Sequence, residues 1–324
     1  SRVSKKFLEK SLIYLLFFIA IISLDFLKQY ITGSNFIGLK PYFCSSNILE
    51  CQRYSGFFGK ELVFGGYFST IIISFFLLLK ILKQNNNLVN FFPIFILIVI
   101  FLSGERSAFL LALVFSIIYY SHIIDFNFKN ILGIFFSICI SILLINFSVK
   151  DTTKSRYYTD IIQLIDFNQP NFLNALKLTP WGLHYNASVL MIAEKPLVGN
   201  GLKSFRIKCK EYEVENSENS DYKVCSTHPH NLYMQLLSET GLLGLLFPLA
   251  LCFTIIKLIF NHILLFIKKR EYLLSNFQIC LIACLIITLW PIIPSLSFFS
   301  NWMNVIFYLP VGFLLYSFNS REKI

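Results

Sequence analysis

Two histidines separated by a single proline are the residues of this chain best suited to acid–base chemistry. They occur in the run Thr-His-Pro-His-Asn at residues 227–231. Pro229 blocks a helical path, so we expect His228 and His230 to lie in a loop and a helix to begin near Asn231. An imidazole titrates near neutral pH and can take a proton from a hydroxyl group. A solvated histidine loop without chemistry is the alternative interpretation.

The same two histidines make a weak metal site. The sequence offers no third histidine beside them, and zinc sites need three or four protein ligands. The nearest cysteines, Cys209 and Cys225, are better explained by a disulfide. We therefore expect neither a bound metal nor another cofactor.

A second chemical feature is a charged pair between two apolar runs, within Ser-Gly-Glu-Arg-Ser-Ala at residues 103–108. A charge this close to a hydrocarbon core is costly and is usually retained for function. The Arg106 guanidinium has the fork geometry that binds a phosphate group through two hydrogen bonds. The alternative is that Glu105 and Arg106 pair with each other or extend toward the membrane surface.

Two more arginines lie in segments with a distinctive composition. Arg53 opens Arg-Tyr-Ser-Gly-Phe before an apolar run, although an interfacial arginine beside aromatic residues is common in membrane proteins. Arg206 follows the turn Gly199-Asn200-Gly201. That turn is not a dinucleotide-binding fingerprint, because Ser204 stands at the third glycine position. A purely structural salt bridge is the alternative role for Arg206.

The elements that must position these residues are membrane helices. The chain is 56% hydrophobic and 14% charged, with a mean hydropathy of +0.64. Its apolar residues come in runs of roughly 17–22, the length that spans a hydrocarbon core. Runs without period-2 alternation predict helices rather than barrel strands. We expect an all-α polytopic membrane protein of about eight spans, at residues 11–27, 62–82, 91–104, 106–123, 130–147, 241–260, 273–293 and 299–317.

Basic residues predict the orientation of these spans. With the N-terminus inside, 13 Lys and Arg residues face the cytosol against four acids, which accounts for nearly all of the net charge of +10. The charge therefore requires no nucleic-acid partner. Residues 1–147 are expected to hold five spans and a first outer loop near 28–61. Residues 148–240 form a large periplasmic loop, and residues 241–324 hold the last three spans.

The cysteines agree with this orientation. Four of the eight cysteines fall in expected spans and the other four fall in the two outer loops. Because disulfides persist in an oxidising periplasm, the pairs Cys44–Cys51 and Cys209–Cys225 are expected bridges. Four free thiols remain the alternative, since pairing cannot be deduced from spacing alone.

The histidine loop also carries a family signature. His230-Asn231, nine residues, Gly241, two residues and Gly244 resemble the H-N-x9-G-x-x-G motif of the O-antigen ligase and O-antigen polymerase superfamily (WaaL and Wzy types). Ser-Glu-Thr-Gly, which contains Glu239, is a familiar variant. Pro-Leu-Val-Gly-Asn-Gly at 196–201 resembles a second family segment. The Arg-Tyr-Ser-Gly-Phe run at Arg53 resembles a third family segment. Family members often have Asp-Pro-Asn after it, whereas this chain has Gly-Lys-Glu.

The resemblance covers about residues 50–260 and implies a fold of the GT-C type with further helices before this region. It implies that His230 and Arg106 are catalytic. It also implies that substrate is bound by Arg206, Arg53, His228, Asn231 and Glu239.

The implied activity is a metal-independent glycosyl transfer in lipopolysaccharide biosynthesis at the periplasmic face of the bacterial inner membrane. The donor is a polysaccharide on undecaprenyl diphosphate, and the acceptor hydroxyl belongs to lipid A-core. A polymerase that extends another glycan chain is one alternative. A transporter or flippase of the same lipid is the other, but it predicts basic residues spread along helices at membrane depth.

Overall fold

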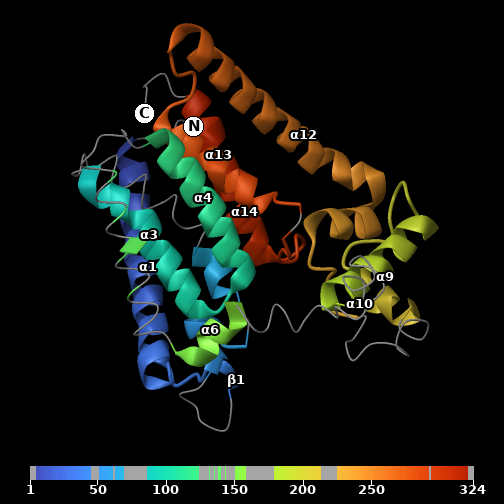
Figure 1. The fold of residues 1–324 in the computed structure, drawn as a ribbon. Helices are drawn as coiled ribbons and strands as arrows, with labels where there is room; N and C mark the ends of the chain where they lie inside the picture. Colours follow the sequence, from blue (N-terminus) through green and yellow to red (C-terminus); the bar gives the residue numbers. More distant parts are fainter. Residues whose placement is uncertain are drawn as a thin grey trace. The chain divides into compact units, whose positions relative to one another are not determined.

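Figure 1 shows the computed structural model of the chain. It describes residues 5–44, 51–60, 63–68, 86–123, 150–157, 179–212, 225–291 and 293–319, together with residues 131, 135, 138, 139 and 143. Most of the expected spans 130–147 and 62–82 therefore lies outside the described residues. The chain divides into two compact units. The first comprises Ser1–Asp160 and Asn276–Ile287, and the second comprises Ile161–Ser275 and Thr288–Ile324.

The first unit is mainly helical. Its helices are α1 (Lys5–Thr32), α3 (Asn86–Ser103), α4 (Arg106–Ile123), α6 (Asp151–Tyr157) and most of α13 (Asn276–Thr288). The helices α3 and α4 pack side by side as a hairpin. Gly104 makes the tight connection with a φ of 74°, a backbone conformation that glycine adopts without a steric penalty. The hairpin matches the two spans expected on either side of the Glu105–Arg106 pair.

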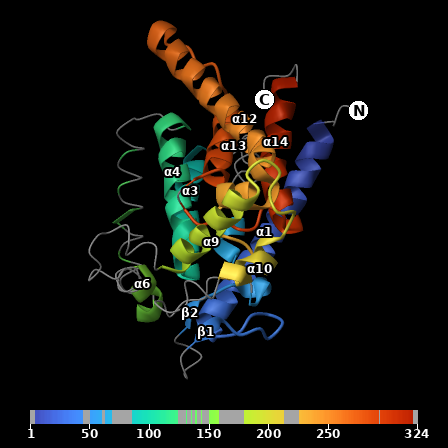
Figure 2. The same cartoon turned by 90° about the vertical axis from the view of Figure 1, so that its right-hand side faces the viewer.

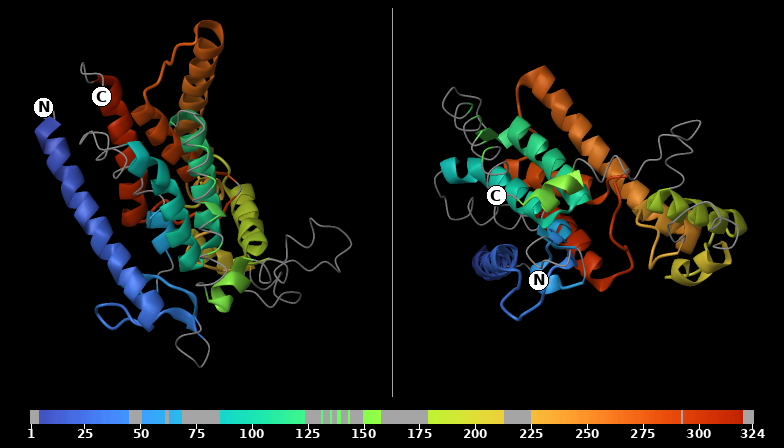
Figure 3. Two further views of the ribbon diagram at one scale, coloured as in Figure 1. Left: turned by 60° about the vertical axis from the view of Figure 1, so that its left-hand side comes forward. Right: turned by 60° about the horizontal axis from the view of Figure 1, so that its bottom comes forward.

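A short antiparallel ribbon accompanies the helices of the expected all-α fold. Strand β1 (Tyr42–Cys44) pairs with β2 (Cys51–Arg53), and a 3-10 turn η1 (Gly56–Phe58) follows. The backbone N–H and C=O groups of the two strands form hydrogen bonds with each other. In an irregular loop these groups would have to bond to water instead. Figures 2 and 3 show the ribbon and its connection to the C-terminal end of α1. The register places Cys44 opposite Cys51, as the expected bridge requires; the bridge itself stays a prediction.

The second unit contains the long helix α12 (Leu232–Lys269) and α14 (Asn301–Asn319). It also contains α9 (Pro180–Glu194), the short α10 (Phe205–Lys208) and the 3-10 turn η2 (Cys209–Tyr212). Gly241 breaks the helical path of α12 with φ 68° and ψ −165°, and Figure 1 shows the bend near the N-terminal end of the helix. The bend falls where the sequence predicts that a span begins.

The expected span at 273–293 is too long at its C-terminal end. The helix α13 ends at Thr288, and residues 289–291 and 293–300 are extended or turning. Pro291 and Pro294 lack the backbone N–H that a continuing helix needs. The carbonyl groups released there accept side-chain hydrogen bonds from α12 and its cap, from the Tyr233 hydroxyl to Leu289 O (2.6 Å) and from Asn231 Nδ2 to Pro291 O (2.7 Å).

Among the described residues, two helices are long and apolar enough to cross a bilayer, Ile13–Thr32 and Leu232–Lys269. Shorter apolar helices are Pro93–Ser103, Arg106–Ser121, Asn276–Thr288 and Phe307–Phe318. Helices thus occur at six of the eight expected spans, and the other two fall largely outside the described residues. The apolar helices agree with a membrane protein, while the number of spans stays a prediction.

Candidate active site

The histidine loop is built on the N-terminus of α12, as the sequence predicts. Asn231 is the N-cap, and its side-chain oxygen accepts hydrogen bonds from Tyr233 N (3.0 Å) and Met234 N (3.1 Å). These bonds satisfy two of the donors that a helix N-terminus leaves unpaired. The expected substrate-binding residue Asn231 therefore has a helix-capping role in this structure, and substrate contact stays a prediction.

The loop is fixed by the segment that follows α13. Ser295 N donates to His230 O (2.7 Å), and Ser295 O contacts the Nε2 atom of His228 (3.3 Å). His230 has a φ of 56°, which is uncommon for a residue with a side chain and marks a locally constrained backbone. Gln235 extends the attachment, because its Oε1 accepts from Phe298 N (2.8 Å). Because α13 ends at Thr288, the segment that follows it can bond to the loop that carries both histidines.

Three imidazole rings lie together in the second unit. The rings of His228 and His230 are 4.1 Å apart between centroids, and His184 lies 5.5 Å from His230. His184 is buried at 7% exposure on α9, and its ring meets Phe205 edge-on. Sequence reasoning missed it because 44 positions separate His184 from His228, and a lone histidine in a helical pattern carries no signal. No group of histidine, cysteine or acidic residues in the described ranges has a metal-binding arrangement.

Burial makes two of these imidazoles poor bases in the free protein. It lowers the pKa of His228 to about 4, with smaller contributions in the same direction from His184 and Arg206. The pKa of His230 is lowered to about 3 by burial first and then by His228 and His184. Desolvation disfavours the charged form of a base, so both side chains are neutral at physiological pH. A neutral imidazole is the form that accepts a proton.

Glu239 organises the turn that precedes Arg206. Its carboxylate accepts hydrogen bonds from Lys203 N (3.0 Å), Phe205 N (3.1 Å) and Gln235 Nε2 (3.3 Å). The side chain is 1% exposed and interacts electrostatically with Arg206. Three donors compensate the cost of burying this acid. Like Asn231, Glu239 has a positioning role here, and its expected contact with substrate is not tested.

Two glycines of the family-like motifs are needed because two backbones meet. A Cβ atom added to Gly241 would lie 2.3 Å from Leu197 O, and one added to Gly199 would lie 2.4 Å from Glu239 C. Gly201 N donates to Glu239 O (2.9 Å), and Leu242 N donates to Pro196 O (2.9 Å). The turn at 196–201 is therefore joined directly to the bend of α12, and no side chain larger than hydrogen fits at either contact.

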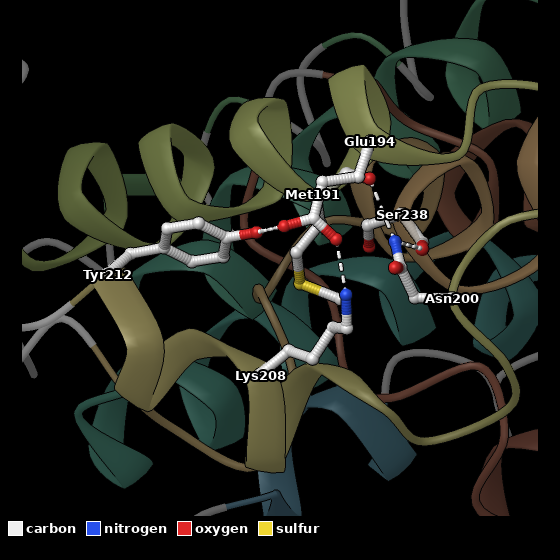
Figure 4. Close-up of polar contacts among 6 residues, drawn as sticks. All are labelled: Met191, Glu194, Asn200, Lys208, Tyr212 and Ser238. Atoms are coloured by element: carbon white, nitrogen blue, oxygen red, sulfur yellow. Dashed lines mark hydrogen bonds and ion pairs between the residues drawn. The ribbon is translucent and has the colours of Figure 1, made fainter.

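The side chains shown in Figure 4 complete this junction. Asn200 Nδ2 donates to Met191 O (2.8 Å) at the end of α9 and to Ser238 O (3.0 Å) on α12. Glu194 accepts from Lys208 Nζ and from the Tyr212 hydroxyl. Through these contacts α9, α10 and the start of α12 form one packed cluster beside the histidine loop.

The expected Cys209–Cys225 disulfide is confirmed. Cys209 packs in a small core with Leu183, Met191 and Phe205. Cys225 lies five positions before His230, so the bond ties the histidine loop to α10 and brings Arg206 into the electrostatic neighbourhood of His228.

Replacing both disulfide cysteines by alanine should lower the free energy of unfolding by roughly 3 kcal/mol, because the unfolded chain gains the freedom of a loop of this length. Thermal unfolding of the detergent-solubilised protein measures the effect. Cys252→Ala, at a cysteine without a disulfide, is the control. Complete alkylation of Cys209 and Cys225 without reductant would contradict the bridge.

Arg106 lies in the first unit, at the N-terminus of α4. Glu105 beside it is buried at 9% exposure, and its Oε1 accepts from Gly65 N (2.7 Å). A Cβ atom on Gly65 would come within 2.9 Å of Ala108 Cβ, so residues 64–68 pack closely against the start of α4. The Glu105 carboxylate therefore accepts a hydrogen bond from the backbone, a contact that the sequence did not predict.

Arg53, also in the first unit, is partly buried at the end of β2. The residues that follow it are anchored to α1, where Gln29 Oε1 accepts from Ser55 N (3.1 Å) and Gly56 N (2.8 Å). Gly56 has a φ of 56°, and a Cβ there would lie 3.1 Å from Asp25 Oδ2. Close packing on α1 therefore explains the glycine of the Arg-Tyr-Ser-Gly-Phe run. The two arginines of this unit and the histidine loop belong to different units, so a shared site stays a prediction.

Comparison with known families adds the decisive observation. Residues 91–249, about half of the chain, match the family described as O-antigen ligase (Wzy_C). This stretch is an O-antigen ligase domain. It includes Arg106, Arg206 and all three clustered histidines, whereas Arg53 lies before it.

A second comparison also finds a ligase. A 75-residue stretch is 41% identical to a protein of Rickettsia bellii (strain RML369-C) named "Putative polysaccharide ligase", and it covers 22% of this chain and 17% of that protein. No solved structure matches the chain. The O-antigen ligase match agrees with the resemblance noted from the motifs and supports a ligase-type function and a membrane protein.

Proposed function

We propose that the protein transfers a polysaccharide from undecaprenyl diphosphate to a hydroxyl of lipid A-core, at the periplasmic face of the inner membrane. The observation that carries the proposal is the neutral, half-buried imidazole of His230, which lies beside His228 in an O-antigen ligase domain, with Arg206 interacting electrostatically with His228. A base and a cation in one loop cluster are the groups that glycosyl transfer from a diphosphate requires.

In the proposed reaction the acceptor oxygen forms a bond with the anomeric carbon of the donor sugar. The bond from that carbon to the diphosphate oxygen breaks, and its electron pair stays on the diphosphate. His230 orients the acceptor hydroxyl and takes its proton. The charge of the bound diphosphate opposes the effect of burial and raises the pKa of His230 toward the working pH, because a nearby anion favours the imidazolium.

Arginine side chains neutralise the leaving diphosphate, where negative charge develops. Arg206 is exposed beside the histidine loop, and Arg106 and Arg53 complete the set. His228 packs against the ring of His230 at 4.1 Å and assists its alignment. Asn231 and Glu239 act by holding the loop and the Arg206 turn through the hydrogen bonds described above.

A polymerase that adds the chain to another glycan is the second candidate, because the same domain type is expected in both activities. Lipopolysaccharide from a strain that lacks the gene distinguishes them. Bare core with lipid-linked chains indicates loss of a ligase, and core capped with single repeats indicates loss of a polymerase. Bare core with the donor lipid retained on the cytosolic side would instead indicate loss of a flippase.

Transfer should persist to a more acidic pH than an ordinary histidine permits. An unperturbed histidine becomes charged near pH 6.5, whereas the pKa of His230 is about 3 and that of His228 about 4. The rate with limiting donor, which reports the pKa values of the free protein, should therefore show no inflection near pH 6.5. Because the unfolded chain binds protons below that pH and the folded loop does not, folding stability should decline progressively as the pH falls below about 6.5.

Initial rates and thermal unfolding measured across the same buffers separate these two effects. His184→Asn is the matched variant: it removes one cause of the lowered pKa of His230, so its acid limb should move to a higher pH. A wild-type acid limb centred near 6.5 would contradict the assigned base.

Arg106→Lys should be nearly as damaging as Arg106→Ala. An ammonium keeps the positive charge but loses the two-pronged hydrogen bonding to a diphosphate. Transfer assayed with purified donor and acceptor measures the loss, and normal retention of the protein in membranes serves as the folding control. Near wild-type rates for the lysine variant would show that only charge matters at this position.

A further inference from the structure

An exposed apolar patch lies on the segment that links α9 to α10 and on α10 itself. Leu197, Val198, Leu202 and Ile207 have exposed fractions between 63% and 68%. Single exposed apolar residues are ordinary, but four large ones within eleven positions indicate a surface that contacts a membrane or another protein. The patch has no role in the proposed chemistry.

Positive charge surrounds this patch. Residues 194–211 hold five lysines and arginines against two acids, and one of those acids, Glu194, is bonded to Lys208. Lys195 and Lys203 are exposed within the apolar segment itself. Leucine and valine flanked by lysine is the composition of a segment that lies in the interface of an anionic bilayer.

The patch is continuous with the apolar face of α12. Leu242 N and Leu243 N donate to Pro196 O (2.9 Å) and Leu197 O (3.3 Å), so the patch is bonded to the first residues after the bend. Leu243 is 62% exposed. The exposed face continues along the helix through Leu246, Phe247, Phe253, Ile256 and Phe260. In a bilayer-spanning α12 the patch would therefore lie where the helix enters the membrane.

We propose that residues 195–203 form an interfacial anchor that binds an anionic phospholipid surface. Leu197, Val198 and Leu202 enter the edge of the hydrocarbon core, while Lys195 and Lys203 bind lipid phosphate groups. The inference rests on the membrane placement of α12 within the proposed function. Its consequence is a fixed depth for the active site, because Gly201 N is bonded to Glu239 O (2.9 Å) and the histidine loop begins the same helix.

Site-specific fluorescence tests the anchor. A fluorescent amino acid is introduced at Val198, at Leu202 or at Val189, an exposed apolar position on α9 (51%) that lies outside the patch. The full chain is reconstituted in phosphatidylcholine vesicles with and without phosphatidylglycerol. Spin labels near the lipid headgroups should quench the probes at 198 and 202 several-fold more than the probe at 189, and aqueous iodide should quench them less.

The charge component is tested by Lys203→Gln. Phosphatidylglycerol should increase lipid quenching at Leu202, and the substitution should remove that increase. Equal quenching at all three positions would overturn the anchor, and quenching independent of phosphatidylglycerol would overturn the headgroup contact. Resistance of Cys209 and Cys225 to alkylation confirms that each labelled loop is folded. No donor or acceptor is present, so an incorrect reaction assignment would leave the result unchanged.

Discussion

His230→Ala is expected to abolish polysaccharide transfer while leaving the protein folded and in the membrane. Positioned general bases contribute about 10²–10⁴-fold to rate, and the loss is larger where the same group orients the acceptor. Purified protein with a lipid-linked donor and an acceptor core gives the rate. The disulfide between Cys209 and Cys225, read by alkylation, reports whether the loop still folds.

His262→Ala is the matched control for this experiment. His262 is buried, at 6% exposure in α12, and its Nδ1 accepts from Leu274 N (3.1 Å) in the connection to α13. Its loss should lower stability and leave the rate per folded molecule close to that of the wild type. Wild-type transfer by His230→Ala would remove the catalytic assignment, whatever the fate of the other histidines.

Gly241→Ala is expected to be strongly destabilising. The new Cβ would lie 2.3 Å from Leu197 O and 2.6 Å from Gly199 N, and the φ of 68° adds a conformational penalty. Backbone atoms cannot move aside as a flexible side chain does, so we expect a loss of more than about 3 kcal/mol. Thermal unfolding and the yield of folded protein in detergent measure it.

Gly312→Ala supplies the comparison, because nothing lies within 4 Å of its added Cβ in α14. Alanine is the better helix former, so this change should be neutral or slightly stabilising. If Gly241→Ala behaved like Gly312→Ala, the contact between the turn at 196–201 and the bend of α12 would not form as described. Activity need not be measured to reach that conclusion.

The sequence was informative where local chemistry dominates. Pro229 and Asn231 locate the histidine loop and the start of α12 because a proline and an N-cap act on the residues next to them. The Cys209–Cys225 pair followed from the large loop that the charge pattern places outside. Gly241 was recognised as part of a motif, but its reason, contact with the turn at 196–201, is visible only when both segments are present.

The features that the sequence did not predict depend on packing between residues that are far apart in the chain. His184 joins the cluster because α9 packs against α12, and nothing in its own helix distinguishes it. The early end of α13 was missed because hydrophobic residues continue beyond Thr288, although Pro291 and Pro294 were visible. The partnership of Glu105 with Gly65 was hidden for the same reason, since 40 positions separate the two residues.

The Cys209–Cys225 bond also restricts how the protein can be produced for study. Cell-free synthesis with dithiothreitol, or purification in a reducing buffer, would yield a chain that lacks the covalent cross-link between the histidine loop and the end of α10. Rates obtained from such a preparation would describe a different molecule. Oxidative refolding, or export in a host that introduces disulfides, should therefore precede any comparison among variants.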